Sequence, residues 1–421
     1  MQGSSSVKIF MQLEAQKRRN LLILFAAGLL FWSSLASLLP TLPQYVEDVG
    51  ASRQQVGIVI GCFAIGLLLS RTKLGRLADQ HSRKLVLIVG TSVLTLAPLG
   101  YLQVDSIGWL MLLRAFHGVS LAAFTTGYSA LVADLSPVHQ RGELIGYMSL
   151  VTPTGLALGP ALGSFLQTEV GYSTLFLVTA GLGFLSLICC CFVCEPKRVQ
   201  AGKESTQPNS YNNVWQLLLS PRLRIPALVL LMTGLAFGAI GTFVALFIRE
   251  TGIALNPGLY FTAAAIVNFC TRLFTGRASD RYGRGLFISG SLICYGLAMF
   301  LLSTAQTPQD FLLAAMAQGI GAGTLLPVMI ALIADRSTAN ERGRVFSACI
   351  SGFDLGIALA GPVFGTFADL LGYQGIFSIT MASISLALII FITQGSQDLS
   401  HSLRFAIGRE QDIYALNKTM Q

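Results

Sequence analysis

The feature that most constrains this chain is the regular return of long, continuous apolar segments. A helix needs about 20 apolar residues to cross a hydrocarbon core of roughly 30 Å. Twelve such segments occur, near residues 21–43, 55–71, 85–102, 107–133, 143–167, 173–194, 225–248, 257–275, 285–304, 310–334, 344–368 and 373–394. They are too long and too continuous for the alternating strands of a membrane β-barrel. The sequence therefore predicts an all-α membrane protein with twelve transmembrane helices.

Composition supports the same conclusion. Only 11% of the 421 residues are charged, and the mean hydropathy is +0.65. Soluble globular proteins carry roughly 25% charged residues. We therefore expect the lipid bilayer, as a cell inner membrane or a plasma membrane, to be the solvent of this multi-pass chain.

The net charge of +8 is explained by topology. On the twelve-helix arrangement, 25 of the 28 lysines and arginines fall in the termini and the connections of one side. Such an asymmetry follows the positive-inside rule, so both termini are expected in the cytoplasm. A nucleic-acid partner is not needed to explain the charge.

An internal repeat divides the chain. Two groups of residues recur 201 positions later: Arg71, Gly75, Arg76, Asp79 and Arg83 as Arg272, Gly276, Arg277, Asp280 and Arg284, and Gly118, Ala133, Asp134, Arg141 and Gly142 as Gly319, Ala334, Asp335, Arg342 and Gly343. Repeats in one orientation predict two pseudo-symmetric six-helix bundles.

The polar stretches place the boundaries of these bundles. We expect a cytoplasmic N-terminus (1–20), an N-terminal bundle (21–194), a cytoplasmic linker (195–221), a C-terminal bundle (222–394) and a cytoplasmic tail (395–421).

A short motif occurs at the same place in both halves. Residues 75–84 read GRLADQHSRK, and residues 276–285 read GRASDRYGRG. The motif resembles the G-x-L-A-D-R-x-G-R-K loop of the major facilitator superfamily, and the resemblance extends over the length, helix number, repeat and linker of the chain. The first copy departs from the family pattern at Gln80 and Ser82, and the second departs at Gly285.

This resemblance implies a gating role for the loops. A short turn between spanning helices is expected to use glycine, and an aspartate there can pair with nearby guanidinium groups. The alternative is that the basic residues only set topology and bind lipid headgroups. The predicted gating residues are Gly75, Asp79, Arg83, Gly276, Asp280, Arg284, Arg141 and Arg342.

The fourth apolar segment contains Arg114 and His117. A charge inside a spanning helix is expensive and should face the bundle interior with a partner. The pair resembles the R-x-x-Q-G motif of drug/proton antiporters, with His117 in place of glutamine. Alternatively, Arg114 snorkels toward the outer interface, and His117 is a hydrogen-bonded packing residue.

The fifth segment carries glycines four residues apart at Gly155, Gly159 and Gly163, together with Pro160. Such spacing allows close helix packing, and proline removes a backbone donor. The run resembles the G-x-x-x-G-P-x-x-G motif of the exporting branches of the family. Generic packing is the alternative.

Asp354 is the acidic residue expected deep in the apolar core, on the eleventh segment. A carboxyl group that gains and loses a proton there could couple proton entry to transport, or it could make a structural hydrogen bond. Asn268 and Gln318 could add polar contacts to a cavity.

No nucleotide-binding loop, metal-ligand cluster or catalytic constellation is recognisable, so we expect neither an enzyme nor a cofactor or metal. The favoured hypothesis is a monomeric, proton-coupled exporter of small amphiphilic molecules. The alternatives are an importer or facilitator of a small nutrient, and a membrane sensor of the same fold that does not transport.

Overall fold

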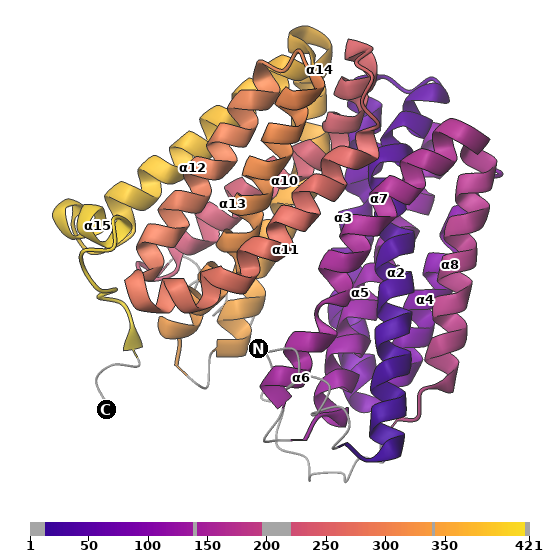
Figure 1. Ribbon diagram of the computed structural model, residues 1–421, viewed down its shortest axis with the longest axis horizontal. Helices are drawn as coiled ribbons and strands as arrows, with labels where there is room; N and C mark the ends of the chain where they lie inside the picture. Colours follow the sequence, from indigo (N-terminus) through magenta and orange to yellow (C-terminus); the bar gives the residue numbers. More distant parts are fainter. Residues whose placement is uncertain (1–12, 138–140, 196–219, 339–341, 417–421) are drawn as a thin grey trace. The chain divides into compact units, whose positions relative to one another are not determined.

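The computed structural model describes residues 13–137, 141–195, 220–338 and 342–416 (Figure 1). All regular secondary structure in these ranges is α-helical. Contacts divide the chain into two compact units: unit 1 is Met1–Val49 with Cys62–Glu204, and unit 2 is Gly50–Gly61 with Ser205–Gln421. The predicted linker lies outside the described residues except at its two ends.

Unit 1 is built from helices that pack lengthwise. Helix α2 lies along α7 and α8, and α4 lies along α5 and α8. The first turns of α3 group with unit 2, and the rest of that helix belongs to unit 1. The helices are α2 (Ala15–Asp48), α3 (Arg53–Gln80), α4 (Arg83–Tyr101), α5 (Ile107–Leu135), α6 (Arg141–Met148), α7 (Val151–Val170) and α8 (Tyr172–Phe192).

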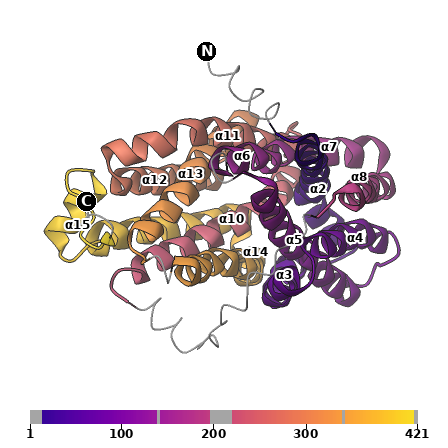
Figure 2. The ribbon, with the colours of Figure 1, turned by 90° about the horizontal axis from the view of Figure 1, so that it is seen from below.

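Unit 2 shows a related arrangement. Helix α10 packs along α14, and α11 and α12 both lie against α13 (Figure 2). The helices are α10 (Arg224–Thr251), α11 (Pro257–Tyr282), α12 (Arg284–Ser303), α13 (Pro308–Asp335), α14 (Arg342–Gln394) and the short α15 (Leu399–Ala406).

Local sequence signals set several helix ends. The Ser82 hydroxyl accepts a hydrogen bond from the Leu85 amide at 3.0 Å and caps α4. Thr307 opens α13 with a reciprocal capping box. Such side chains satisfy amide groups that the helix itself leaves without acceptors. Gly372 interrupts α14 with a φ of 66°, a backbone conformation that glycine adopts without steric strain.

The predicted fold class is confirmed. In the described residues, ten helices are long and apolar enough to cross a membrane. The interruption at Gly372 makes α14 two successive helices, and α11 adds a further helix of 26 residues. Helix α11 is not among these ten, and its apolar part is interrupted by Asn268 and Arg272. The described residues thus account for the twelve predicted helices.

Candidate functional site

An arginine–aspartate ion pair recurs in both units, at positions related by the 201-residue repeat. In unit 1, Arg83 at the start of α4 pairs with Asp134 at the end of α5. In unit 2, Arg284 at the start of α12 pairs with Asp335 at the end of α13, with Nε and Oδ2 separated by 2.5 Å. Each pair connects the motif-bearing turn to a neighbouring helix of its own unit.

These pairs are only partly shielded from solvent. The side chains of Arg83 and Asp134 are 20% and 28% exposed, and those of Arg284 and Asp335 are 21% and 33% exposed. A partly exposed ion pair contributes little net stability and can be broken at modest cost. That property is compatible with a contact that forms and breaks during a conformational cycle.

Glu195 adds a second constraint on the first motif. Its carboxylate accepts hydrogen bonds from the Ser82 hydroxyl at 2.5 Å and from the Arg83 amide at 2.9 Å. It thus places a negative charge at the N-terminus of α4, which the helix dipole favours. Glu195 is the first residue of the predicted linker, and its distance along the chain from Ser82 gives no sequence signal of this contact.

The structure corrects the expected role of two glycines. Gly75 and Gly276 lie inside α3 and α11 rather than in a turn, and a Cβ atom at either position would meet open space. The turns instead use Ser82 and Gly283, and Gly283 has a φ of 95°. The motif glycines are therefore not required by turn geometry in this conformation.

The other predicted gating residues have varied positions. Asp280 pairs with Arg284 at 3.3 Å, and Asp79 is exposed near the end of α3. Arg141 and Arg342 begin α6 and α14, and their side chains lie outside the described part of the structure.

Arg114 is buried in unit 1, with 7% of its surface exposed. Its Cζ atom lies 4.4 Å from the centre of the Phe63 ring on α3, a cation–π contact. Its Nη1 lies 3.4 Å from Nδ1 of His117, and Nε has no hydrogen-bond partner within the ranges that the structure describes. Arg114 forms no ion pair with a carboxylate of the described residues.

His117 is fully buried next to Arg114. The Tyr101 hydroxyl of α4 lies 3.3 Å from Nδ1 of His117. Because a guanidinium group can only donate, Nδ1 acts as the acceptor and the ring proton is assigned to Nε2. Nε2 has no partner in the described residues. These are the contacts of a neutral, hydrogen-bonded histidine.

The polar residues predicted for the second half are distributed over three helices. Gln318 on α13 is buried, with 5% of its surface exposed, and Asn268 on α11 is half-buried. Their helices meet closely here, since a Cβ atom at Gly323 would lie 2.6 Å from the Asn268 carbonyl oxygen. Asp354 on α14 is half-buried, which is less than the deep burial that was expected.

The glycines of α7 form its contact surface with α2. A Cβ atom at Gly159 would lie 2.6 Å from the Ser33 carbonyl oxygen, and one at Gly163 would collide with the Ser37 backbone. Gly155 meets Trp32 in the same way, and Pro160 is buried inside the helix. The predicted small-residue face therefore packs against α2.

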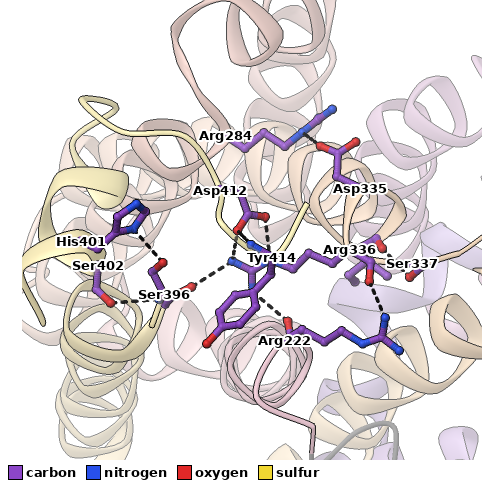
Figure 3. A network of polar contacts seen from close by, with 12 residues as sticks. Arg222, Arg284, Asp335, Arg336, Ser337, Ser396, His401, Ser402, Asp412 and Tyr414 are labelled. Carbon is purple, nitrogen blue, oxygen red and sulfur yellow. Dashed lines mark hydrogen bonds and ion pairs between the residues drawn. The ribbon is translucent and has the colours of Figure 1, made fainter. Parts of the chain in front are cut away.

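One polar centre was not anticipated. Arg336, which follows α13, is 1% exposed, although the charge pattern of the sequence indicates only a role in topology for a residue at this position. Its guanidinium binds the Asp412 carboxylate twice, at 2.7 and 2.9 Å, and donates to the carbonyl oxygens of Arg222 and Gly395 (Figure 3). It thereby holds together the segment before α10, the end of α14 and the C-terminal tail.

The fold defines a class: a helical membrane protein made of two repeat-related units. The sequence matches the Major Facilitator Superfamily over residues 23–308 and 255–406. The chain belongs to this superfamily, and it is therefore a membrane transporter by family.

Two relatives carry names that refer to drug resistance. The chain is 28% identical over 378 residues to the multidrug resistance protein MdtG of Klebsiella pneumoniae (strain 342), covering 86% of this chain and 90% of the relative. It is 27% identical over 395 residues to the multi-drug resistance efflux pump PmrA of Streptococcus pneumoniae serotype 4, covering 90% and 97%.

Solved structures share the fold. The nucleoside transporter NupG matches with a TM-score of 0.72 at 15% identity, covering 90% of this chain and 100% of that one. A bacterial homologue of the human lysosomal transporter Spinster, inward-facing and occupied, also gives a TM-score of 0.72 at 15% identity, covering 91% and 97%. At this identity the likeness concerns the fold alone.

Proposed function

We propose that this protein is a proton-coupled exporter of small amphiphilic molecules that works by alternating access. The observation that carries the proposal is Arg114, a buried guanidinium on α5 that is not ion-paired with a carboxylate in the described residues. A buried charge without a counterion is costly and marks a functional position in a membrane protein. It can change partner when a proton or a substrate enters.

The direction of transport is inferred from two features. The tight contact of the α7 glycines with α2 involves the motif that resembles the exporting branches of the family. The relatives MdtG and PmrA are named as resistance and efflux proteins. Both features favour export over import.

Gating is assigned to the two repeated ion pairs. Arg83 with Asp134, and Arg284 with Asp335, hold the motif-bearing turns against α5 and α13. We propose that these pairs break and re-form as each unit changes conformation. We further propose that both termini lie in the cytoplasm. The protein would work as a monomer without a cofactor.

Transport into inverted membrane vesicles tests the proposal. The probe is ethidium, an amphiphilic cation, with an imposed gradient that is acidic inside the vesicle. Gradient-driven uptake that a protonophore abolishes is the expected result. Arg114→Gln should remove this uptake, whereas Arg19→Gln, at an exposed site on α2, should preserve it.

Four outcomes would contradict the proposal in whole or in part. Ethidium uptake that is indifferent to the proton gradient would remove proton coupling, and wild-type uptake by Arg114→Gln would remove Arg114 from the mechanism. Uptake of a sugar or nucleoside by cells, with no ethidium export, would favour the importer. Absence of any transport, with preserved binding, would favour the sensor.

A further inference from the structure

The C-terminal helix α15 presents an apolar stripe to the outside. Leu399, Leu403 and Ile407 follow one another at intervals of four residues, and they are 57%, 43% and 52% exposed. Residues at this spacing lie on one side of a helix. Arg404, whose side chain is 60% exposed, lies next to the stripe.

The opposite side of α15 is firmly attached to unit 2. Phe405 is buried, and its carbonyl oxygen lies so close to Gly285 of α12 that no side chain could be accommodated there. Ser402 is buried and accepts a hydrogen bond from the Ser396 amide at 2.9 Å. The outward stripe is therefore held in a fixed position and is not the face by which α15 is anchored.

The stripe continues an apolar face of α12. Gly408, just after α15, lies against Leu286 near the start of α12. A Cβ atom at Gly408 would lie 3.2 Å from the Cβ atom of Leu286. From there an exposed row runs along α12 at Leu286, Ile293, Leu297 and Phe300, each at least 41% exposed. On a spanning helix such a row faces lipid. Figure 1 shows α15 at the end of α12 and α14.

A hollow of about 760 Å³ lies between the α11–α12 turn and the tail, at the C-terminal end of α15, where Phe405, Gly408 and Arg409 line it and the stripe residues do not. Its cations include Arg281 and Arg409, both exposed, and neither is in an ion pair within the described residues. Each of its four carboxylates is in an ion pair within unit 2: Asp280 and Asp335 share Arg284, Glu410 pairs with Arg404 and His401, and Asp412 pairs with Arg336.

We propose that α15 and this hollow form a binding site for anionic phospholipid. The stripe of Leu399, Leu403 and Ile407 lies among the acyl chains at the membrane boundary, where α15 follows directly on the spanning α14. Arg281 and Arg409 bind the lipid phosphate in the hollow. An amphipathic helix with arginines beside an apolar face binds an anionic membrane surface in this way. The inference needs only the membrane placement of unit 2 and is independent of the transported substrate.

Lipid titration of the full-length protein in detergent tests the site. The melting temperature is followed while dioctanoyl phosphatidylglycerol, dioctanoyl phosphatidylcholine or inorganic phosphate is added. We expect a stabilising shift with phosphatidylglycerol at concentrations where the other two have none. In Arg281→Gln/Arg409→Gln, half-saturation should need about 30-fold more phosphatidylglycerol, which corresponds to about 1 kcal/mol for each arginine.

A matched double variant and a stripe variant complete the experiment. Arg19→Gln/Lys73→Gln removes two exposed cations of unit 1 and should respond like the wild type. Leu399→Ser/Leu403→Ser/Ile407→Ser changes only exposed side chains, so it should fold and melt normally without lipid but respond weakly to phosphatidylglycerol.

Three results would overturn the proposed lipid site. Equal shifts with phosphatidylglycerol and phosphatidylcholine would overturn the anionic selectivity, and an unchanged response of either site variant would overturn the location. An equal shift with inorganic phosphate would replace the lipid site by a site for a soluble anion. Transport activity enters none of these measurements, so the site and the proposed function can fail separately.

Discussion

The Arg336 guanidinium and the Asp412 carboxylate form a two-fold hydrogen-bonded ion pair, with donor–acceptor distances of 2.7 and 2.9 Å. Their side chains are 1% and 9% exposed, the most complete burial of any ion pair in the described residues. The Tyr414 ring lies 5.1 Å from the Arg336 guanidinium carbon. The C-terminal tail therefore supplies the counterion of a buried charge in unit 2.

Asp412→Asn should destabilise the protein strongly. It leaves the Arg336 guanidinium buried without a counterion, and removing one partner of a buried pair costs about 3–5 kcal/mol. A lowered melting temperature of the purified protein in detergent is the measurement. Glu410→Gln is the matched control, because Glu410 is 29% exposed and pairs with the exposed Arg404 and with His401, and partly exposed pairs are worth about 0–1 kcal/mol. Equal effects of the two variants would contradict the structural role of Asp412.

Arg83 and Asp134 should behave as a coupled unit. Arg83→Gln and Asp134→Asn each break the same ion pair, so the double variant should transport no more slowly than the worse single variant. Contacting residues usually show interaction energies of about 0.5–3 kcal/mol in a double-mutant cycle. Initial ethidium transport rates provide the measurement.

The second copy of this pair provides a replicate. Arg284→Gln and Asp335→Asn should show the same pattern in unit 2. Effects that simply add in both cycles would mean that the two residues of each pair act separately, and the gating assignment would then be wrong.

The helices and the repeat could be predicted from the sequence because both depend on periodic, local signals. The apolar runs gave the twelve helices, and the offset of 201 residues identified Arg83 and Asp134 as counterparts of Arg284 and Asp335. The offset does not indicate that the arginine and the aspartate of one unit pair with each other. The two are 51 positions apart, and only the packing of neighbouring helices brings them together.

The Arg336 centre was missed for a related reason. Arg336 and Asp412 are separated by 76 positions, and both lie in polar stretches that composition assigns to connections. Helix α15 spans eight residues, too few for an apolar run to be recognised. The four-residue spacing of Leu399, Leu403 and Ile407 was the available signal of an amphipathic helix.

Gly163→Ala should disturb the contact between α7 and α2. The added methyl group would meet the Ser37 backbone, which cannot rotate away, and overpacking of this kind costs about 1–3 kcal/mol. Gly181→Ala on α8 is the matched control, because a methyl group there meets open space. We expect a lower melting temperature and slower transport for the first variant only. Indistinguishable variants would show that α2 and α7 can move apart at no cost.

Asp354→Asn should abolish gradient-driven transport and leave the protein folded. Asp354 is half-buried on α14, so the amide can occupy the same volume without the proton exchange that coupling requires. Asp369→Asn, at an exposed position on the same helix, is the control and should retain wild-type rates. Uptake of ethidium into inverted vesicles and the melting temperature are measured together.

Asp354→Glu refines this test, because a carboxyl group on a longer side chain can still exchange a proton. We expect Asp354→Glu to recover part of the gradient-driven rate that Asp354→Asn loses. Downhill movement of ethidium, measured without a proton gradient, should persist in Asp354→Asn if coupling alone has been removed. Full gradient-driven uptake by Asp354→Asn would exclude Asp354 from proton coupling and leave Arg114 as the only buried charge assigned to that role.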